Sequence, residues 1–77
     1  MDIRHVFAAN LRRLRHAKKL TQEELAFEAG INRSYMSRLE RGGTYAGLEI
    51  IAKLADVLSV EPAELLKLPT KRGARVR

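Results

Sequence analysis

The side chains best suited to a chemical task gather in residues 31–39. Ile31, Met36 and Leu39 fall on one side of a helix there. The opposite side carries hydrogen-bond donors and no carboxylate: Arg33, Ser34, Ser37 and Arg38. An arginine presents paired N–H groups that match O6 and N7 of guanine in the major groove of DNA. The segment therefore predicts a helix that reads base edges in a DNA groove.

A second short helix is expected just before this one, joined to it by a glycine turn. Thr21 and Glu24 have the spacing of a capping box, which begins a helix. Gly30 suits the left-handed residue that ends that helix, and Asn32 is a good cap for the next one. Two short helices with a sharp turn between them are typical of the helix-turn-helix motif of DNA-binding proteins.

Apolar residues at spacings of three and four predict helices in the rest of the chain. We expect one over about residues 3–18, one over about 47–58, and a last one that begins near Pro62 and stops before Pro69. Their inward residues are expected to be Ile3, Phe7, Leu11, Leu14, Leu48, Ile51, Leu54, Ala55 and Leu58. No β-alternation, repeat or heptad run competes, so the predicted fold class is all-α, a compact five-helix bundle with a helix-turn-helix motif.

Charge is unevenly distributed along the chain. Of its 77 residues, 15 are basic and 9 acidic, a formal net charge of +6. Residues 71–77 hold four of the basic residues and no acid, so residues 1–70 keep 11 basic and 9 acidic residues, a charge of only +2. We expect a helix-turn-helix DNA-binding domain over residues 1–68 and a basic, disordered tail over residues 69–77. The tail is either a solvated terminus or an arm that lies along phosphates.

The composition argues against other classes of protein. Cysteine is absent, and His5 and His16 cannot form a metal site alone. No phosphate-binding glycine loop or catalytic constellation can be assembled, so we expect no enzyme activity, no catalytic residue, no metal and no cofactor. No apolar run approaches the roughly 20 residues that span a bilayer, and the amino terminus lacks a signal-peptide core. We expect a cytoplasmic protein associated with a prokaryotic nucleoid.

The chain resembles the phage-repressor-like helix-turn-helix family, the Cro and xenobiotic-response-element type found in prokaryotic repressors and restriction-modification controllers. The resemblance covers about residues 5–66 and rests on three segments in order: Thr21-Gln22-x-x-Leu25-Ala26 with Gly30-Ile31, then Ser34-x-x-Ser37-x-Leu39-Glu40-x-Gly42, then Leu54-Ala55-x-x-Leu58. It implies a lambda-repressor-like fold in which the third helix lies in the major groove and the second spans the backbone above it. Residues 32–37 are particularly similar to the restriction-modification controllers.

The resemblance also implies roles for individual residues. The base-reading positions match Arg33, Ser34 and Arg38. Contacts to the DNA backbone are expected from Gln22, Tyr35, Ser37, Arg15, Arg41 and Thr44. Arg15 and Glu40 match a pair that in many members bridges the first helix to the third, so Glu40 would orient Arg15 toward a phosphate.

Some residues keep two interpretations. Ala46 and Gly47 stand where many relatives have proline followed by serine or threonine, so the loop before them decides whether Thr44 reaches the DNA backbone. Tyr35 is either a DNA contact or a partly buried core aromatic. Arg12 is expected on the solvated face of the first helix, where it adds general electrostatic attraction.

The leading interpretation is a sequence-specific DNA-binding transcriptional regulator, a repressor or autoregulator. Its partner would be double-stranded DNA, bound as a homodimer with two third helices about 34 Å apart on a partly palindromic operator. Dimerisation is expected through the carboxy-terminal helices, which hold more apolar residues than a small bundle hides: Val57, Leu65, Leu66 and Leu68. The alternative is an antitoxin or adaptor whose bundle mainly binds a partner protein. An RNA-binding role has less support because few aromatic residues are available for stacking on bases.

Overall fold

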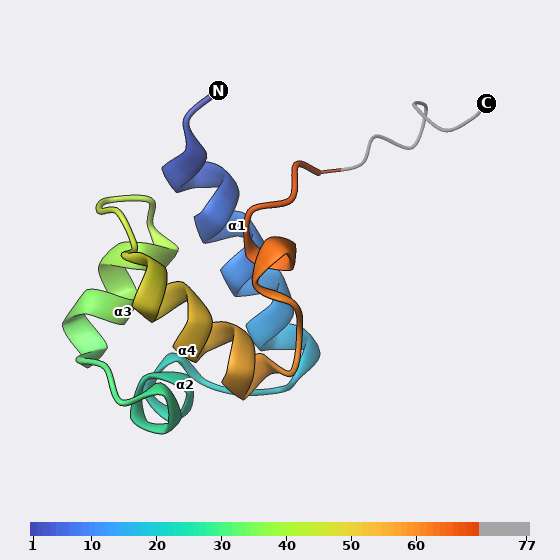
Figure 1. Cartoon of the computed structure of the whole chain (residues 1–77). Helices are drawn as coiled ribbons and strands as arrows, with labels where there is room; N and C mark the ends of the chain where they lie inside the picture. Colours follow the sequence, from blue (N-terminus) through green and yellow to red (C-terminus); the bar gives the residue numbers. More distant parts are fainter. Residues whose placement is uncertain (70–77) are drawn as a thin grey trace.

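The computed structural model describes residues 1–69, and these form four α-helices and one 3-10 helix (Figure 1). The elements are α1 (Ile3–Ala17), α2 (Gln22–Ala29), α3 (Arg33–Glu40), α4 (Leu48–Leu58) and η1 (Pro62–Leu65). The all-α fold class is confirmed. Of the tail expected over residues 69–77, all but Pro69 lies outside the described residues.

The fifth expected helix is a single 3-10 turn. Its backbone bonds run from residue i to i+3, from the Glu64 amide to the Glu61 carbonyl and from the Leu66 amide to the Ala63 carbonyl. Pro62 is a suitable first residue for a helix. With only four residues, however, the element is too short for the repeated i to i+4 bonds of an α-helix and forms the tighter 3-10 turn instead. This short turn folds back and packs against α1 and α4.

The caps predicted around α2 and α3 are present. The Thr21 hydroxyl accepts a bond from the Glu24 amide, and the Glu24 carboxylate accepts one from the Thr21 amide. Gly30 is left-handed at φ 71°, and the side chain of Asn32 accepts bonds from the first amides of α3. Glycine adopts the left-handed conformation at little cost, so the chain can turn sharply within three residues between α2 and α3.

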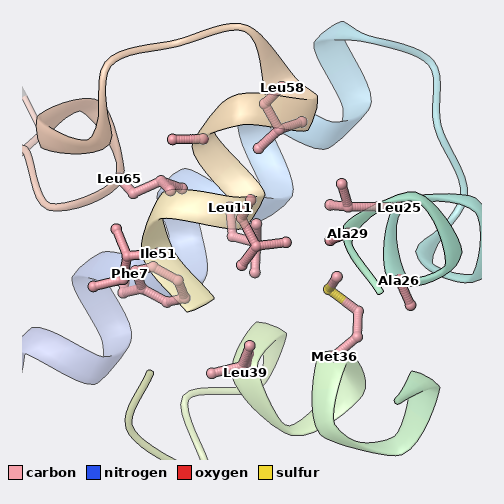
Figure 2. Packing of buried hydrophobic residues seen from close by; sticks show 12 residues of the cluster. Phe7, Leu11, Leu25, Ala26, Ala29, Met36, Leu39, Ile51, Leu58 and Leu65 are labelled. Carbon is pink, nitrogen blue, oxygen red and sulfur yellow. The ribbon is translucent and has the colours of Figure 1, made fainter. Parts of the chain in front are cut away.

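One hydrophobic core holds the helices together (Figure 2). Its buried members are Phe7, Leu11, Leu25, Ala26, Ala29, Met36, Leu39, Ile51, Leu54, Ala55, Leu58 and Leu65. Met36 and Leu39 point from α3 into this core, and both are fully buried. Burying a side chain of this size contributes about 1.5–3 kcal/mol, so the inner face of α3 is firmly attached to the bundle.

Three apolar residues are placed differently from the expectation. Ile3 and Leu48 were expected to face inward, but they are 40% and 85% exposed. Each lies in the first turn of its helix, beyond the edge of the core. Leu65 was expected on a dimer surface, yet it is fully buried because η1 packs against α1 and α4.

A buried asparagine fixes the segment that contains Leu65. The Asn10 side-chain amide donates to the carbonyls of Leu65 at 3.0 Å and Lys67 at 2.8 Å, and its oxygen accepts from Arg13 at 3.2 Å. Because a buried amide is costly unless its groups are bonded, these contacts specify where the chain after η1 lies on α1. Sequence reasoning missed Asn10, although it falls between Phe7 and Leu14 on the inward stripe of α1.

Candidate nucleic-acid interface

The outer face of α3 presents the three residues expected to read bases. Arg33, Ser34 and Arg38 are exposed, and neither arginine forms an ion pair with any residue in the described part of the chain. At 100° per residue, Arg33 and Arg38 lie about 140° apart around the helix with Ser34 between them, roughly opposite Met36 and Leu39. The face that carries the donors is thus free, while the opposite face is buried.

Tyr35 is partly buried, as one of its two interpretations expected. Its ring is half-buried and packs against the core cluster, and its hydroxyl donates to the Tyr45 carbonyl at 3.2 Å. The guanidinium of Arg38, one turn further along α3, lies over the same ring, 5.7 Å from its centroid. This distance is within the range of a cation–π interaction. A contact between Tyr35 and DNA stays a prediction.

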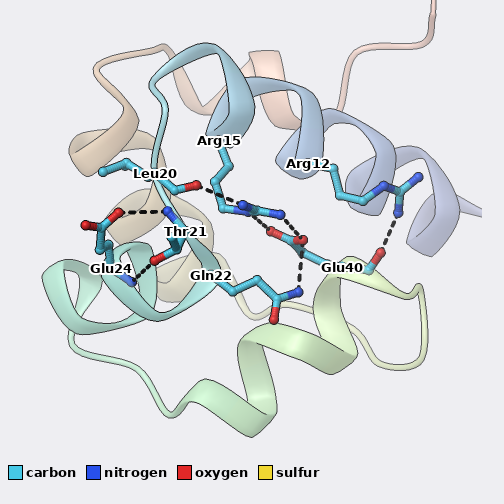
Figure 3. A network of polar contacts seen from close by, with 7 residues as sticks. All are labelled: Arg12, Arg15, Leu20, Thr21, Gln22, Glu24 and Glu40. Carbon is cyan, nitrogen blue, oxygen red and sulfur yellow. Dashed lines mark hydrogen bonds and ion pairs between the residues drawn. The ribbon is translucent and has the colours of Figure 1, made fainter.

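The carboxy-terminal end of α3 is joined to α1 by a buried ion pair (Figure 3). Arg15 donates from Nε to Oε2 of Glu40 at 2.6 Å and from Nη2 to Oε1 at 2.9 Å. The Arg15 and Glu40 side chains are only 11% and 3% exposed. The hydrogen bond to Glu40 raises the pKa of Arg15 above its ordinary value. A two-point guanidinium–carboxylate contact fixes orientation as well as distance, so it sets the position of α3 relative to α1.

Further donors converge on the same end of α3. The side-chain amide of Gln22, at the start of α2, donates to Oε1 of Glu40 at 3.1 Å. Arg15 also donates to the Leu20 carbonyl at 2.8 Å, which ties the chain before α2 to the pair. Gln22 was expected to contact a phosphate, and the structure places its amide on a protein carboxylate. Glu40 therefore connects α1, α2 and α3.

Arg12 is exposed on α1, as expected, but it also makes a bond within the protein that was not expected. Its guanidinium donates to the main-chain carbonyl of Glu40 (Figure 3). The last carbonyls of a helix have no partner within it, and a cation near them is favoured by the helix dipole. No pattern in the sequence marks this contact, because its acceptor is a main-chain group.

The remaining predicted backbone contacts lie near the end of α3 and in the loop after it. Arg41 is exposed and donates to the Ser37 hydroxyl at 2.6 Å. Thr44 is half-buried and, with Tyr45, borders a small cleft of about 120 Å³ beside the start of α1. Gly47 caps α4 without a side-chain bond. Whether Ser37, Arg41 and Thr44 touch DNA stays a prediction.

Residues 1–69 contain no group of three or more histidine, cysteine, aspartate or glutamate side chains placed to hold a metal ion. Within the same range no helix has the length and apolar character that crossing a membrane requires.

Comparison with known proteins gives a family that fits this geometry. Residues 6–68 match the family described as "Helix-turn-helix domain". The chain is 39% identical over 70 residues to control protein C.BamHI of Bacillus amyloliquefaciens, a match that covers 90% of this chain and 86% of the relative.

Two solved structures share the fold. The restriction-modification controller protein C.AhdI from Aeromonas hydrophila is 48% identical with a TM-score of 0.78, over 80% of this chain and 94% of that one. The N-terminal DNA-binding domain of SinR from Bacillus subtilis is 28% identical with a TM-score of 0.81, over 87% of this chain and 99% of that one. The chain thus belongs to the helix-turn-helix family of the Cro and xenobiotic-response-element type, and it is a DNA-binding transcriptional regulator, not an enzyme.

Proposed function

We propose that this chain binds a partly palindromic operator as a homodimer, with α3 in the major groove, and acts in the cytoplasm as a repressor or autoregulator. The observation that carries this proposal is the contrast between the two faces of α3. Its outer face leaves Arg33, Ser34 and Arg38 exposed, and its inner face is buried through Met36 and Leu39. A rigid helix with free donors is what direct readout of bases requires.

Arg33 and Arg38 are proposed to read guanine. Each arginine can donate two bonds to O6 and N7 of one guanine, worth about 1–3 kcal/mol of discrimination against another base. Ser34 lies between them and can contact either kind of base edge. The proposed operator half-sites therefore contain guanine.

Contacts to phosphates are proposed for Arg15, Gln22, Ser37, Arg41 and Thr44. For Arg15 this role is restricted by its bonds within the protein. A guanidinium has five N–H donors, and Glu40 and the Leu20 carbonyl take up three of them in the described residues. The remaining N–H groups of Arg15 and the second N–H of Gln22 can bind a phosphate while both side chains stay bonded to Glu40.

The proposed dimer surface lies near the start of α4 and the end of η1. Leu48 is 85% exposed, Leu66 is 40% exposed and Leu68 is 54% exposed, whereas Leu65 and the half-buried Val57 pack within the chain's own core. Ile3 also belongs to this region, because it borders the same small cleft as Leu66. Solvent-exposed apolar residues that lie together often mark an interface.

The relatives point to a biological setting. One is called a control protein, and another is described as a restriction-modification controller. We propose that this chain likewise regulates genes of a restriction-modification system, including its own.

Selection of bound duplexes from a random DNA pool tests the proposal. We expect enrichment of a partly palindromic sequence with guanine in each half-site, and half-site centres about one helical turn apart. A pool that stays random after repeated rounds would contradict sequence-specific binding, and an enriched single half-site would contradict the dimer.

Binding to a partner protein, as in an antitoxin or adaptor, is a second candidate function. Phe27 favours it, because this aromatic residue of α2 is 84% exposed between the acidic residues Glu24 and Glu28. Isolation of the chain from its native cells with a stoichiometric protein partner and no operator DNA would support this function over the first.

A further inference from the structure

A continuous series of contacts links the start of the chain to Arg38. Asp2 accepts two bonds from the Arg4 guanidinium, at 3.2 and 2.8 Å. That guanidinium lies over the Tyr45 ring, 5.0 Å from its centroid. The Tyr45 carbonyl accepts the bond from the Tyr35 hydroxyl at 3.2 Å, and the Tyr35 ring lies beneath the Arg38 guanidinium at 5.7 Å.

The middle of this series lies in residues 41–47, which join α3 to α4 beside the start of α1 (Figure 1). Tyr45 itself is 67% exposed, so few contacts within the core hold it. Arg4 on its ring and Tyr35 on its carbonyl supply contacts from α1 and α3. The loop and the Tyr35 ring thus fix each other's position.

A fixed ring beneath the Arg38 guanidinium restricts the motion of this side chain before DNA binds. A long, exposed arginine side chain samples many rotamers, and ordering it when it binds a base costs free energy. Residues three apart on a helix are neighbours, so a ring at position 35 can hold the guanidinium at position 38. A guanidinium that is already ordered loses less conformational entropy on binding.

We propose that Tyr35 is a positioning residue for base reading: its ring orients the Arg38 guanidinium, and its hydroxyl, through the Tyr45 carbonyl, fixes the ring. The inference rests on the proposed function, in which Arg38 reads a base. It differs from the role that the family resemblance implies, a direct contact between Tyr35 and the DNA backbone. The two roles predict different patterns of binding.

A double-mutant cycle separates the two roles. Tyr35→Leu, Arg38→Ala and the double variant are compared on the selected operator and on a duplex changed at the base that Arg38 reads. We expect Tyr35→Leu to reduce discrimination between the duplexes about two- to fivefold, the size of an exposed cation–π interaction, and to have no such effect once Arg38 is alanine. An equal loss on both duplexes that persists in the Arg38→Ala background would overturn the proposal and indicate a direct backbone contact.

Tyr35→Phe is the matched variant that keeps the ring and removes only the hydroxyl. We expect it to retain most of the discrimination, with a loss of about twofold or less from a less firmly held ring. Backbone amide NMR spectra of both Tyr35 variants verify that the bundle is folded.

Side-chain proton NMR spectra of the same variants provide a readout without DNA. In the free protein the Tyr35 ring should shift the Arg38 δ-methylene protons upfield, and the shift should be lost in Tyr35→Leu but kept in Tyr35→Phe. Unchanged Arg38 resonances in Tyr35→Leu would overturn the proposal.

The outcomes also distinguish this inference from the proposed function. Wild-type protein without any sequence preference would overturn both, because there would be no base reading to position. Sequence-specific wild-type protein whose Tyr35 and Arg38 variants show no coupling would overturn the positioning role alone.

Discussion

The outer face of α3 and the buried Glu40 side chain at its carboxy-terminal end differ in how many of their groups are already bonded within the protein. On the outer face, Arg33 and Arg38 are exposed and have no carboxylate partner in the described residues. At the carboxy-terminal end, the Glu40 carboxylate is 3% exposed and accepts bonds from Arg15 and Gln22. Both regions contain arginine, so arginine content alone does not distinguish a DNA contact from a structural one. The difference lies in whether the protein already occupies the donors.

The two regions therefore have separate tasks. Groups whose bonds are satisfied within the protein fix the position of a helix, and groups left free are available for a ligand. Substitutions at Glu40 should therefore mainly change the stability of the fold, and substitutions on the outer face should mainly change DNA binding.

The largest expected effect comes from Glu40→Ala. The substitution leaves the mostly buried Arg15 without its carboxylate and Gln22 without an acceptor, so we expect the free energy of unfolding to fall by about 2–3 kcal/mol. Urea denaturation followed by circular dichroism measures this change. Glu40→Gln, which keeps the shape and one acceptor oxygen, should lose less. A loss below about 0.5 kcal/mol in Glu40→Ala would mean that the ion pair does not anchor α3.

Arg38→Ala should have the opposite profile. We expect stability within about 0.5 kcal/mol of the wild type, because the side chain is exposed. Discrimination at the base that Arg38 reads should fall by about 1–3 kcal/mol. Titration of operator variants measures this, with Lys53→Ala, an exposed residue of α4, as the control for loss of one positive charge. An equal loss of affinity on every variant would assign Arg38 to a phosphate contact.

Arg41→Ala should lower affinity without changing sequence preference. Arg41 is exposed next to the reading face, and its bond to Ser37 leaves other donors for a phosphate. Loss of one phosphate contact should reduce the slope of log affinity against log salt concentration by about 1. Binding at several salt concentrations gives this slope, and an unchanged slope would remove Arg41 from the interface.

The smallest effect is a pH dependence at the start of α1. The side-chain bonds from Arg4 lower the pKa of Asp2 from 3.8 to about 2. Because its folded-state pKa is depressed, ionised Asp2 should stabilise the fold above about pH 4, and this contribution should be lost as the pH falls toward 2. Asp2→Asn keeps a capping side chain, so its melting temperature should be lower than that of the wild type at pH 7 and approach it near pH 2. A constant difference across this range would exclude the carboxylate charge as the cause.

The sequence predicted the features that depend on neighbouring residues. The Thr21–Glu24 capping box, the left-handed Gly30 and the Asn32 cap are set within a few positions, so residue type and spacing are sufficient. The same holds for the buried positions of α3, because Met36 and Leu39 follow helical periodicity.

Features that depend on packing between distant segments were harder to predict. The bond from Arg12 to the Glu40 carbonyl and those from Asn10 to main-chain carbonyls have acceptors that any residue type provides. The burial of Leu65 follows from where η1 folds back, which the apolar pattern alone does not give. The pairing of Arg15 with Glu40 came from the family resemblance, and the addition of Gln22 to it required the structure.

Base preference, measured on one pooled operator library, tests most directly the division between the outer face of α3 and its anchoring contacts at Glu40. Wild type, Arg38→Ala and Glu40→Gln are compared at matched fractions bound. We predict that Arg38→Ala loses preference at one symmetry-related base pair in each half-site, while Glu40→Gln binds more weakly with the wild-type preference intact. A changed preference in Glu40→Gln together with an unchanged one in Arg38→Ala would contradict the account.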